Sequence, residues 1–205
     1  MLFLLDSNVF INAARLYYSP DIAPTFWGWL TEQNRLGRIA SVSRVKDEID
    51  DGEMGYLKKW SSELPNTFWL RPGVKAMDID SMSRLADWTM HPDRPYRDSA
   101  RAEFLNVADY YLVAQAHSTG AAVVTFELPA PSSRRRVLIP DACRAMGVSY
   151  FEPFGVYRRL GLRFSVEPCS VQVMPEHVVP LPGLVGELLQ AGRQRARELQ
   201  GLLDR

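Results

Sequence analysis

The chain has 205 residues, of which 46% are hydrophobic and 23% are charged, a composition typical of a globular protein with a sizeable core. Lys and Arg together number 24, as do Asp and Glu, so the net charge is zero and there is no basic excess of the kind that permanent binding to nucleic acid usually requires. The two cysteines, Cys143 and Cys169, form no CxxC pair, which argues against a disulfide scaffold and a structural zinc site and favours a cytoplasmic location.

The first half of the chain predicts alternating strands and helices. Residues 2–5, LFLL, form an apolar run typical of a strand covered on both faces, and Asp6 follows at once. Asp6, Ser7 and Asn8 offer N-cap chemistry for a helix that continues through VFINAARLYY. We then expect, in chain order, a helix over 24–36, a strand over 38–43, helices within 44–51 and 54–64, and a short strand over 68–71.

The second half continues the alternation. We expect a helix over 75–90, a loop over 91–98, one or two helices over 99–118 with a division near Asn106, a strand over 120–126, a loop over 128–136, a helix over 139–147 and a strand over 148–151. This order predicts an α/β domain with a mostly parallel sheet over 1–160. Residues 161–205 predict a C-terminal extension with a β-like stretch, a Pro-rich linker and an amphipathic helix, whose apolar stripe could pack on its own domain, a second copy or a partner.

The segment Met1–Leu5 is too short for a signal peptide, and no run of about 18 apolar residues exists. We therefore expect no membrane association. A soluble cytoplasmic protein is the expectation that follows.

Four acidic residues stand where this architecture predicts a common edge. Asp6 and Glu127 follow the two all-apolar strands, and the carboxyl ends of parallel strands face one crevice. Asp109 falls in the first turn of its helix if Asn106 caps that helix, and Glu48 follows the strand at 38–42 by about one and a half turns. Each acid alone could be a cap, a dipole partner or a solvated charge. Together they predict one acidic site.

Carboxylates that lie close together repel one another, and this repulsion must be offset by protons or by a cation. Two unit charges about 4 Å apart repel by roughly 1 kcal/mol in water and about 4 kcal/mol at a protein-surface dielectric. Such a group has raised pKa values or holds a cation. An all-oxygen set without His or Cys favours Mg²⁺ or Mn²⁺, and the expected chemistry is metal-assisted hydrolysis of a phosphodiester.

The segments LLDSNVFI, VKDEI, ADYYLVAQA and VVTFE resemble, in order and rough spacing, the four acidic motifs of PIN-domain ribonucleases, in particular the VapC-like toxins of bacterial toxin–antitoxin pairs. The segment IPDACRAMGVSYFEPFGVYRRLG is similar to a PIN-like branch that carries I-P-D-x-C before its last strand. The resemblance covers about 1–160. It implies a three-layer α/β/α fold, Mg²⁺ or Mn²⁺ as cofactor, RNA as substrate, a homodimer, and a cognate antitoxin protein as partner.

Residue by residue, the resemblance implies catalytic and metal-binding roles for four acids: Asp6, Glu48, Asp109 and Glu127. Ser7 and Asn8 match the small polar pair that holds the first Asp and its water. The sequence departs from the family in having Glu127 where many members have Asp or Asn pairs, and in a longer middle region, 52–98. Asp141 is a further acid that either joins the acidic rim or caps its own helix.

RNA contact near an acidic site needs local positive charge. Arg134, Arg135 and Arg136 lie in the loop after Glu127, and two more cations, Arg44 and Lys46, precede Glu48. Our hypothesis is that these residues bind backbone phosphates, and the alternative is that they are solvated surface charges. The aromatic residues Phe26, Trp27, Trp29, Trp60, Phe68, Trp69 and Trp88 could stack on bases, but a place in the core or an interface is the more common role.

Other α/β enzymes fit the sequence less well. A haloacid-dehalogenase-type phosphatase needs a second Asp where this chain has Asn8, and neither G-x-G-x-x-G nor GK[ST] is present. The alternative from a different class is a catalytically inactive PIN-like module that binds nucleic acid or protein.

Overall fold

The computed structural model describes residues 1–164, which form a compact unit, Met1–Phe164. Cys169 and the Pro-rich linker and amphipathic helix expected toward the C-terminus lie outside the described residues. The predicted division of the chain at residue 160 therefore stays a prediction.

A parallel sheet forms the centre of the described unit. Its five strands within residues 1–164 lie in the order β3-β2-β1-β4-β5, and each neighbouring pair is parallel. The strands are β1 (Phe3–Leu5), β2 (Ile39–Val42), β3 (Trp69–Leu70), β4 (Ala122–Val124) and β5 (Tyr150–Phe151). The prediction of an α/β fold with a mostly parallel sheet is confirmed.

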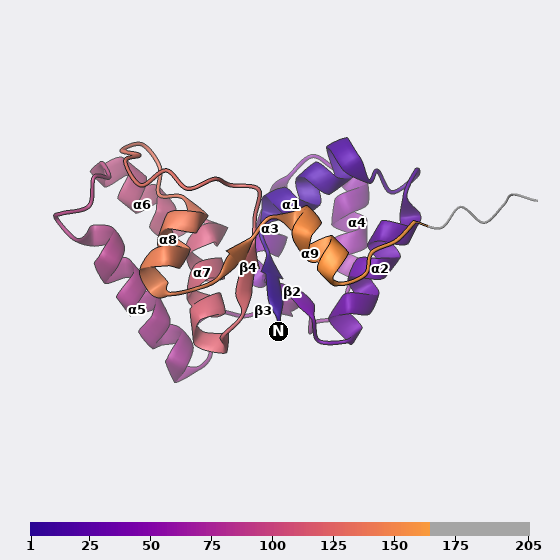
Figure 1. Ribbon diagram of the computed structural model, residues 1–205, viewed down its shortest axis with the longest axis horizontal. Coiled ribbons are helices and arrows are strands. Elements are labelled where there is room, and N and C mark those ends of the chain that lie inside the picture. The colour runs from indigo at the N-terminus through magenta and orange to yellow at the C-terminus, as the bar shows by residue number, and fades with distance from the viewer. Residues whose placement is uncertain (165–205) are drawn as a thin grey trace, which may run out of the picture. The chain divides into compact units, whose positions relative to one another are not determined.

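Helices cover both faces of this sheet (Figure 1). Helices α5, α6, α7 and α8 lie on one side, and α1, α2, α4 and α9 lie on the other, which gives three α/β/α layers. Their bounds are α1 (Ser7–Asn12), α2 (Pro24–Arg35), α3 (Ser43–Asp51), α4 (Gly55–Glu63), α5 (Ala76–Met90), α6 (Asp98–Asn106), α7 (Ala108–Thr119), α8 (Ile139–Met146) and α9 (Pro153–Arg159), with a π-helical segment, η1 (Ala13–Tyr17), after α1. Within residues 1–164 no helix is long and apolar enough to cross a bilayer.

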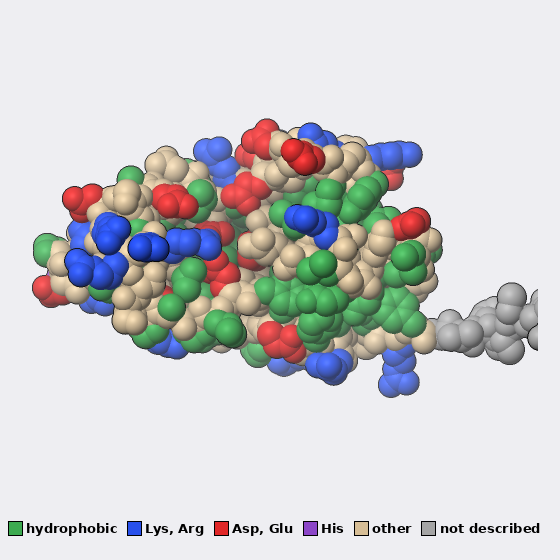
Figure 2. All heavy atoms as spheres, turned by 90° about the horizontal axis from the view of Figure 1, so that it is seen from above, with side chains coloured by type: hydrophobic (Ala, Val, Ile, Leu, Met, Phe, Trp, Pro, Cys, Tyr) green, Lys and Arg blue, Asp and Glu red, His purple; other side chains and the backbone are tan. Residues whose placement is uncertain are grey.

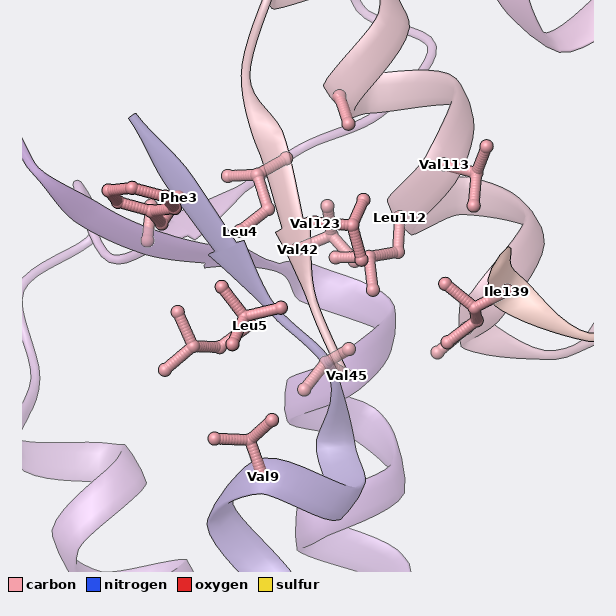
Figure 3. Packing of buried hydrophobic residues seen from close by; sticks show 14 of the residues in the cluster. Phe3, Leu4, Leu5, Val9, Val42, Val45, Leu112, Val113, Val123 and Ile139 are labelled. Carbon is pink, nitrogen blue, oxygen red and sulfur yellow. The ribbon is translucent and has the colours of Figure 1, made fainter. Parts of the chain in front are cut away.

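The core explains why β1 and β4 lack polar alternation. Leu4, Leu5, Val123 and Val124 are each 0% exposed because both strands are covered on their two faces. Figure 3 shows these strands packed against residues of α7 and α8, including Leu112. Burying one such aliphatic side chain contributes about 1.5–3 kcal/mol. This packing holds the carboxyl ends of β1 and β4 in place.

Most of the predicted aromatic stacking candidates belong to the core. Phe26, Trp27, Phe68 and Trp69 are buried, and Phe10 packs against Phe68 and Trp69 with ring centroids 6.0 and 6.1 Å apart. For these four residues a place in the core, and not stacking on bases, is the correct prediction. They stabilise the fold and are not available to RNA bases.

The predicted capping of α7 by Asn106 is wrong. The helical region over 99–118 does divide, at Val107, whose backbone is extended with φ −94° and ψ 167°. Asn106, however, is the last residue of α6, and its Nδ2 donates to the carbonyl of Ala102 at 2.8 Å. The side chain thus continues the α6 hydrogen-bonding pattern, and another residue must satisfy the first amides of α7.

The strand order reverses between β1 and β4, and we call the edge beyond the carboxyl ends of these two strands the crevice. From β1 the chain crosses over to β2 and then β3 on one side, whereas β4 leads to β5 on the other side. The neighbouring strands β1 and β4 therefore flank a topological switch point, where open α/β sheets bind ligands outside the carboxyl ends of their strands. Asp6 follows β1 directly, and Thr125 and Glu127 follow β4.

Candidate functional site

Asp6 directly follows β1 at the switch point and is 0% exposed. Thr125 Oγ1 donates to its Oδ2 at 3.0 Å, and Ser7 Oγ donates to its Oδ1 at 3.3 Å. It occupies the N-cap position of α1, but its carboxylate makes no capping hydrogen bond. Burial raises the pKa of Asp6 to about 6, the bond from Thr125 opposes that shift, and the nearby charges of Glu127 and Glu48 add to it.

Asp109 lies in the first turn of α7, as predicted. Burial raises its pKa to about 8, and the negative charges of Asp6, Glu127 and Glu48 raise it further in that order. The positive charge of Arg136 acts in the opposite direction. The Asp109 carboxyl group is therefore protonated for most of the time at neutral pH when no cation is bound.

Glu48 caps α7 in place of Asn106. Its Oε1 accepts a hydrogen bond from the backbone amide of Ala108, the first residue of α7, at 3.1 Å. Glu48 projects from α3, so this bond connects two helices that the sequence separates widely. A carboxylate at a helix N-terminus is favoured both by the unpaired amides and by the helix dipole.

Glu127 is held by three contacts at the end of β4. Its Oε2 accepts from the amide of Ile139 at 2.8 Å, and its Oε1 accepts from Arg136 Nη2 at 3.1 Å. Its own amide donates to Thr125 Oγ1 at 3.1 Å. Thr125 therefore bonds to both Asp6 and Glu127, and it orients the two acids that follow the central strands.

The structure brings the four predicted acids to one place. Asp6 and Asp109 each respond to the charges of Glu48 and Glu127, and Asp109 also responds to Asp6. Figure 2 views the edge to which the strands' carboxyl ends point, and acidic side chains gather near the middle of it. The four carboxylates are therefore close enough to act on one another's charge.

Metal binding by this acidic group depends on its donor atoms and their spacing. Among residues 1–164 no set of three or more His, Cys, Asp or Glu side chains is arranged to hold a metal. Glu48 and Glu127 are bonded to backbone amides. The donor set itself, four carboxylates without His or Cys, has the chemistry that Mg²⁺ or Mn²⁺ requires. These oxygen donors are of the type that such an ion prefers. Some of their present hydrogen bonds would have to break for the ion to bind.

The three supporting residues differ in position. Ser7 is buried and bonded to Asp6, whereas Asn8 is exposed. Asp141 is buried, and its Oδ2 accepts from the amide of Ala130 at 3.0 Å. Its Oδ1 forms an ion pair with Arg144 at 3.8 Å, and it does not cap α8.

The basic residues predicted to bind RNA have different surroundings in the structure. Arg136 bonds to Glu127, and Arg134 and Arg135 are exposed in the same loop. In Figure 2, Lys and Arg side chains lie to the left of the central acids, over the side that carries α5 to α8. Arg44 stacks over the ring of Tyr111 at 4.8 Å, and Lys46 pairs with Asp50 on its own helix. Arg136 is the only one of these that acts on Asp109.

Sequence reasoning missed Thr125, although VVTFE places a hydroxyl two residues before Glu127, where one side chain can reach two strand ends. It also missed an aromatic cluster of Tyr17, Phe126 and Phe154. Tyr17 is 48% exposed, and its ring centroid lies 5.9 Å from that of Phe126 and 5.2 Å from that of Phe154. No sequence motif predicts this cluster, because η1 and the loop after β4 are far apart in the sequence and come together only in the folded chain.

These features define an α/β protein with a carboxylate-rich crevice at the switch point of a parallel sheet. Residues 3–164 match the family described as "Domain of unknown function (DUF4411)", and the chain belongs to that family. No curated protein and no solved structure matches the chain.

Proposed function

We propose that this protein is a divalent-metal-dependent endoribonuclease that hydrolyses RNA phosphodiester bonds at the switch-point crevice. The observation that carries the proposal is the environment of Asp109. A buried carboxyl group with a pKa of about 8, surrounded by three further acids, either keeps its proton or has its negative charge offset by a bound cation. The sequence resemblance to PIN-domain ribonucleases points to the same four residues.

The metal would be held by oxygens of Asp6, Asp109, Glu48 and Glu127. A bound Mg²⁺ or Mn²⁺ supplies a water of lowered pKa and offsets negative charge on the phosphate. The chain's own residues prepare the crevice for it. Thr125 fixes the orientation of Asp6, and the Ala108 amide fixes that of Glu48.

Asp109 acts as a proton reservoir in this proposal. Its carboxyl group holds a proton at neutral pH without a cation and releases it when a cation binds, since the opposing positive charge lowers the pKa. Metal affinity should therefore rise with pH up to about 8. Arg136, already within 3.1 Å of Glu127, supplies the positive charge nearest to the acids and is the residue we assign to the RNA phosphate.

The biological setting follows from the resemblance. We propose that the protein is the toxin of a toxin–antitoxin pair, acts in the cytoplasm, forms a homodimer and is silenced by a cognate antitoxin protein. The aromatic cluster of Tyr17, Phe126 and Phe154 borders the loop that carries Glu127 and is the surface we assign to the antitoxin. Figure 2 shows hydrophobic side chains on the right of the acidic centre.

RNA cleavage with and without metal tests the proposal. Wild-type protein, Asp6→Asn, Asp109→Asn and the matched control Asp80→Asn are incubated with a mixture of single-stranded RNAs in Mg²⁺, Mn²⁺ or a chelator. Asp80 is exposed on α5. We expect metal-dependent cleavage by wild type and Asp80→Asn, and none by the two site variants. Equal cleavage by wild type and Asp6→Asn would exclude the site.

The second candidate is a binding module without catalysis. The observation that favours it is that Glu48 and Glu127 are already bonded to backbone amides. A binding module without catalysis is supported if no RNA is cleaved with either metal, if expression of the protein does not arrest growth, and if the protein still binds RNA.

A further inference from the structure

Two segments beside the crevice concentrate positive charge, and we call them together the arginine surface. Residues 91–98 and 128–136 contain five arginines and two aspartates, whereas the whole chain has no net charge. The five are Arg94, Arg97, Arg134, Arg135 and Arg136. Figure 2 shows Lys and Arg side chains gathered on this side of the acidic centre. A local excess of this kind on a neutral protein indicates a surface for a polyanion.

The two segments are fixed to one another and to the helices beside them. The backbone amide of Arg97 donates to the carbonyl of Arg134 at 3.0 Å, so the segments lie side by side. Arg101, in α6, donates to the carbonyls of Met90 and Arg94 at 3.2 and 3.1 Å. Four prolines within the two segments further restrict the backbone, because each fixes its own φ. The arginines are therefore presented from a constrained backbone.

Most of these arginines carry charge that no acidic side chain offsets. Among residues 1–164, four of the five guanidinium groups form no ion pair, namely those of Arg94, Arg97, Arg134 and Arg135. Arg97, Arg134 and Arg135 are also exposed to solvent. Neighbouring guanidinium groups repel one another, and a row of phosphates would offset that repulsion. Arginine is suited to this role because its planar fork binds two phosphate oxygens at once.

Arg136 connects the arginine surface to the crevice. Its Nη2 donates to Glu127 at 3.1 Å, and its charge lowers the pKa of Asp109. Arg134 lies two residues earlier in the chain, so the Cα atoms of these two arginines are at most about 7.6 Å apart. The hydrogen bond between Arg134 and Arg97 then continues the surface into the segment 91–98. An RNA with one phosphate at the crevice therefore meets further arginines along the same strand.

We propose that the arginine surface binds the backbone phosphates of the RNA on one side of the cut, an inference that rests on the proposed ribonuclease function. Arg136 contacts the phosphate nearest the acids, and Arg134 and Arg97 contact phosphates farther along the strand. Phosphate contacts carry no sequence information, so this surface positions the strand and does not select bases. The substrate class is therefore a single-stranded RNA that extends several nucleotides beyond the cut, and a dinucleotide is a poor substrate.

RNA binding without metal tests the surface independently of cleavage. A labelled single-stranded RNA oligonucleotide is titrated with the full chain in a chelator, and fluorescence anisotropy gives the affinity from low to moderate salt. Arg97→Gln removes the charge and keeps the backbone amide that donates to Arg134. We expect several-fold weaker binding and a slope of log affinity against log salt that is smaller by about 0.7, as for one phosphate contact on a single strand. In the double variant with Arg134→Gln the two reductions should add to about 1.4.

Arg35→Gln is the matched control. Arg35 is likewise exposed, but it lies on α2, on the opposite side of the sheet, where it pairs with Glu32. Its replacement should change neither the affinity nor the salt slope. An unchanged slope in Arg97→Gln, or an equal fall in Arg35→Gln, would overturn the proposal.

Cleavage kinetics test the requirement for a long strand. With a long RNA, the effect of Arg97→Gln should fall on KM rather than kcat, because its contact is remote from the reacting phosphate and is equally strong before and during the reaction. With a dinucleotide, wild type and Arg97→Gln should both cleave slowly and at the same rate. A dinucleotide that wild type cleaves as efficiently as a long RNA would contradict the proposal.

The two proposals fail separately. RNA cleavage that requires metal, with no effect of Arg97→Gln on KM or on the salt slope, overturns the arginine surface and leaves the ribonuclease. RNA binding whose salt slope depends on Arg97 and Arg134, in a protein that cleaves no RNA, supports the arginine surface and overturns the ribonuclease.

Discussion

The carboxylate of Glu48 accepts a hydrogen bond from the amide of Ala108 at 3.1 Å across 60 positions of sequence. Ala108 begins α7, and Asp109 is the next residue. The bond therefore fixes the start of the helix that carries the most strongly perturbed acid, and it sets the distance between two of the four carboxylates. A single contact thus serves both the fold and the candidate site.

Glu48→Gln and Glu48→Ala separate these two roles. Gln keeps an oxygen that can accept from Ala108, so the free energy of unfolding should change little, whereas Ala removes the cap and should destabilise by about 1 kcal/mol. Both variants lose the charge and should lose metal-dependent cleavage. Urea unfolding and RNA cleavage measure the two effects. A Gln variant that cleaves RNA as well as wild type would contradict a metal role for Glu48.

Asp109→Asn should stabilise the metal-free protein while it abolishes activity. Each pKa unit corresponds to about 1.4 kcal/mol, and the pKa of Asp109 rises from 3.8 to about 8. Removing the ionisable group should therefore raise the free energy of unfolding at pH 8 by a few kcal/mol, on the order of 1–4. Thermal unfolding in a chelator measures this, with Asp80→Asn as the control. Destabilisation by Asp109→Asn at pH 8 would contradict the repulsion.

The stability of the metal-free protein should fall as pH rises. Asp6 and Asp109 keep their protons in the folded state up to about pH 6 and 8, whereas in the unfolded state they release them near the model value of 3.8. Between pH 4 and 8 the folded state binds more protons, so the free energy of unfolding decreases with pH and levels off above about 8. Melting curves across this range in a chelator measure the slope.

Metal should reverse that trend. Added Mn²⁺ should raise the melting temperature more at pH 8 than at pH 5, because fewer protons must leave the carboxylates when the ion binds. Differential scanning fluorimetry at both pH values, with and without Mn²⁺, compares the shifts. A shift of the same size in Asp6→Asn would place the ion elsewhere.

Thr125→Val should perturb Asp6 without changing the shape of the core. The Thr125 hydroxyl opposes the raised pKa of Asp6, so its loss should raise that pKa further. It also leaves a buried oxygen without its donor, which costs about 1–3 kcal/mol. Thr125→Ser retains the hydroxyl and should behave as wild type. Urea unfolding and the pH profile of cleavage distinguish the two variants.

Replacement of Arg134, Arg135 and Arg136 by Ala should weaken RNA binding and flatten its salt dependence. Each lost phosphate contact on single strands reduces the slope of log affinity against log salt by about 0.7. Fluorescence anisotropy with a labelled RNA, from low to moderate salt, measures the slope. Arg44→Ala, which removes a cation stacked on Tyr111, gives a matched comparison. An unchanged affinity and slope in the triple variant would contradict the hypothesis.

Much of the fold could be predicted from local patterns. The apolar runs at β1 and β4, Pro24 at the start of α2 and the division of the region over 99–118 all appear in the structure near the expected residues. Such elements follow from periodicity, turn residues and caps that act over a few positions. Part of the candidate site could also be predicted, because a parallel sheet brings the residues after β1 and β4 to one edge.

Neighbouring residues were enough to predict that Asp6 and Glu127 follow buried strands and that Asp109 lies in the first turn of a helix. The packing of distant segments was needed to show that Glu48 and not Asn106 caps α7, that Thr125 connects Asp6 with Glu127, and that Asp141 accepts a hydrogen bond from the amide of Ala130. These relationships depend on which amides and hydroxyls remain unpaired once distant segments pack. Desolvation and hydrogen bonding are properties of that packed environment, and no local pattern encodes them.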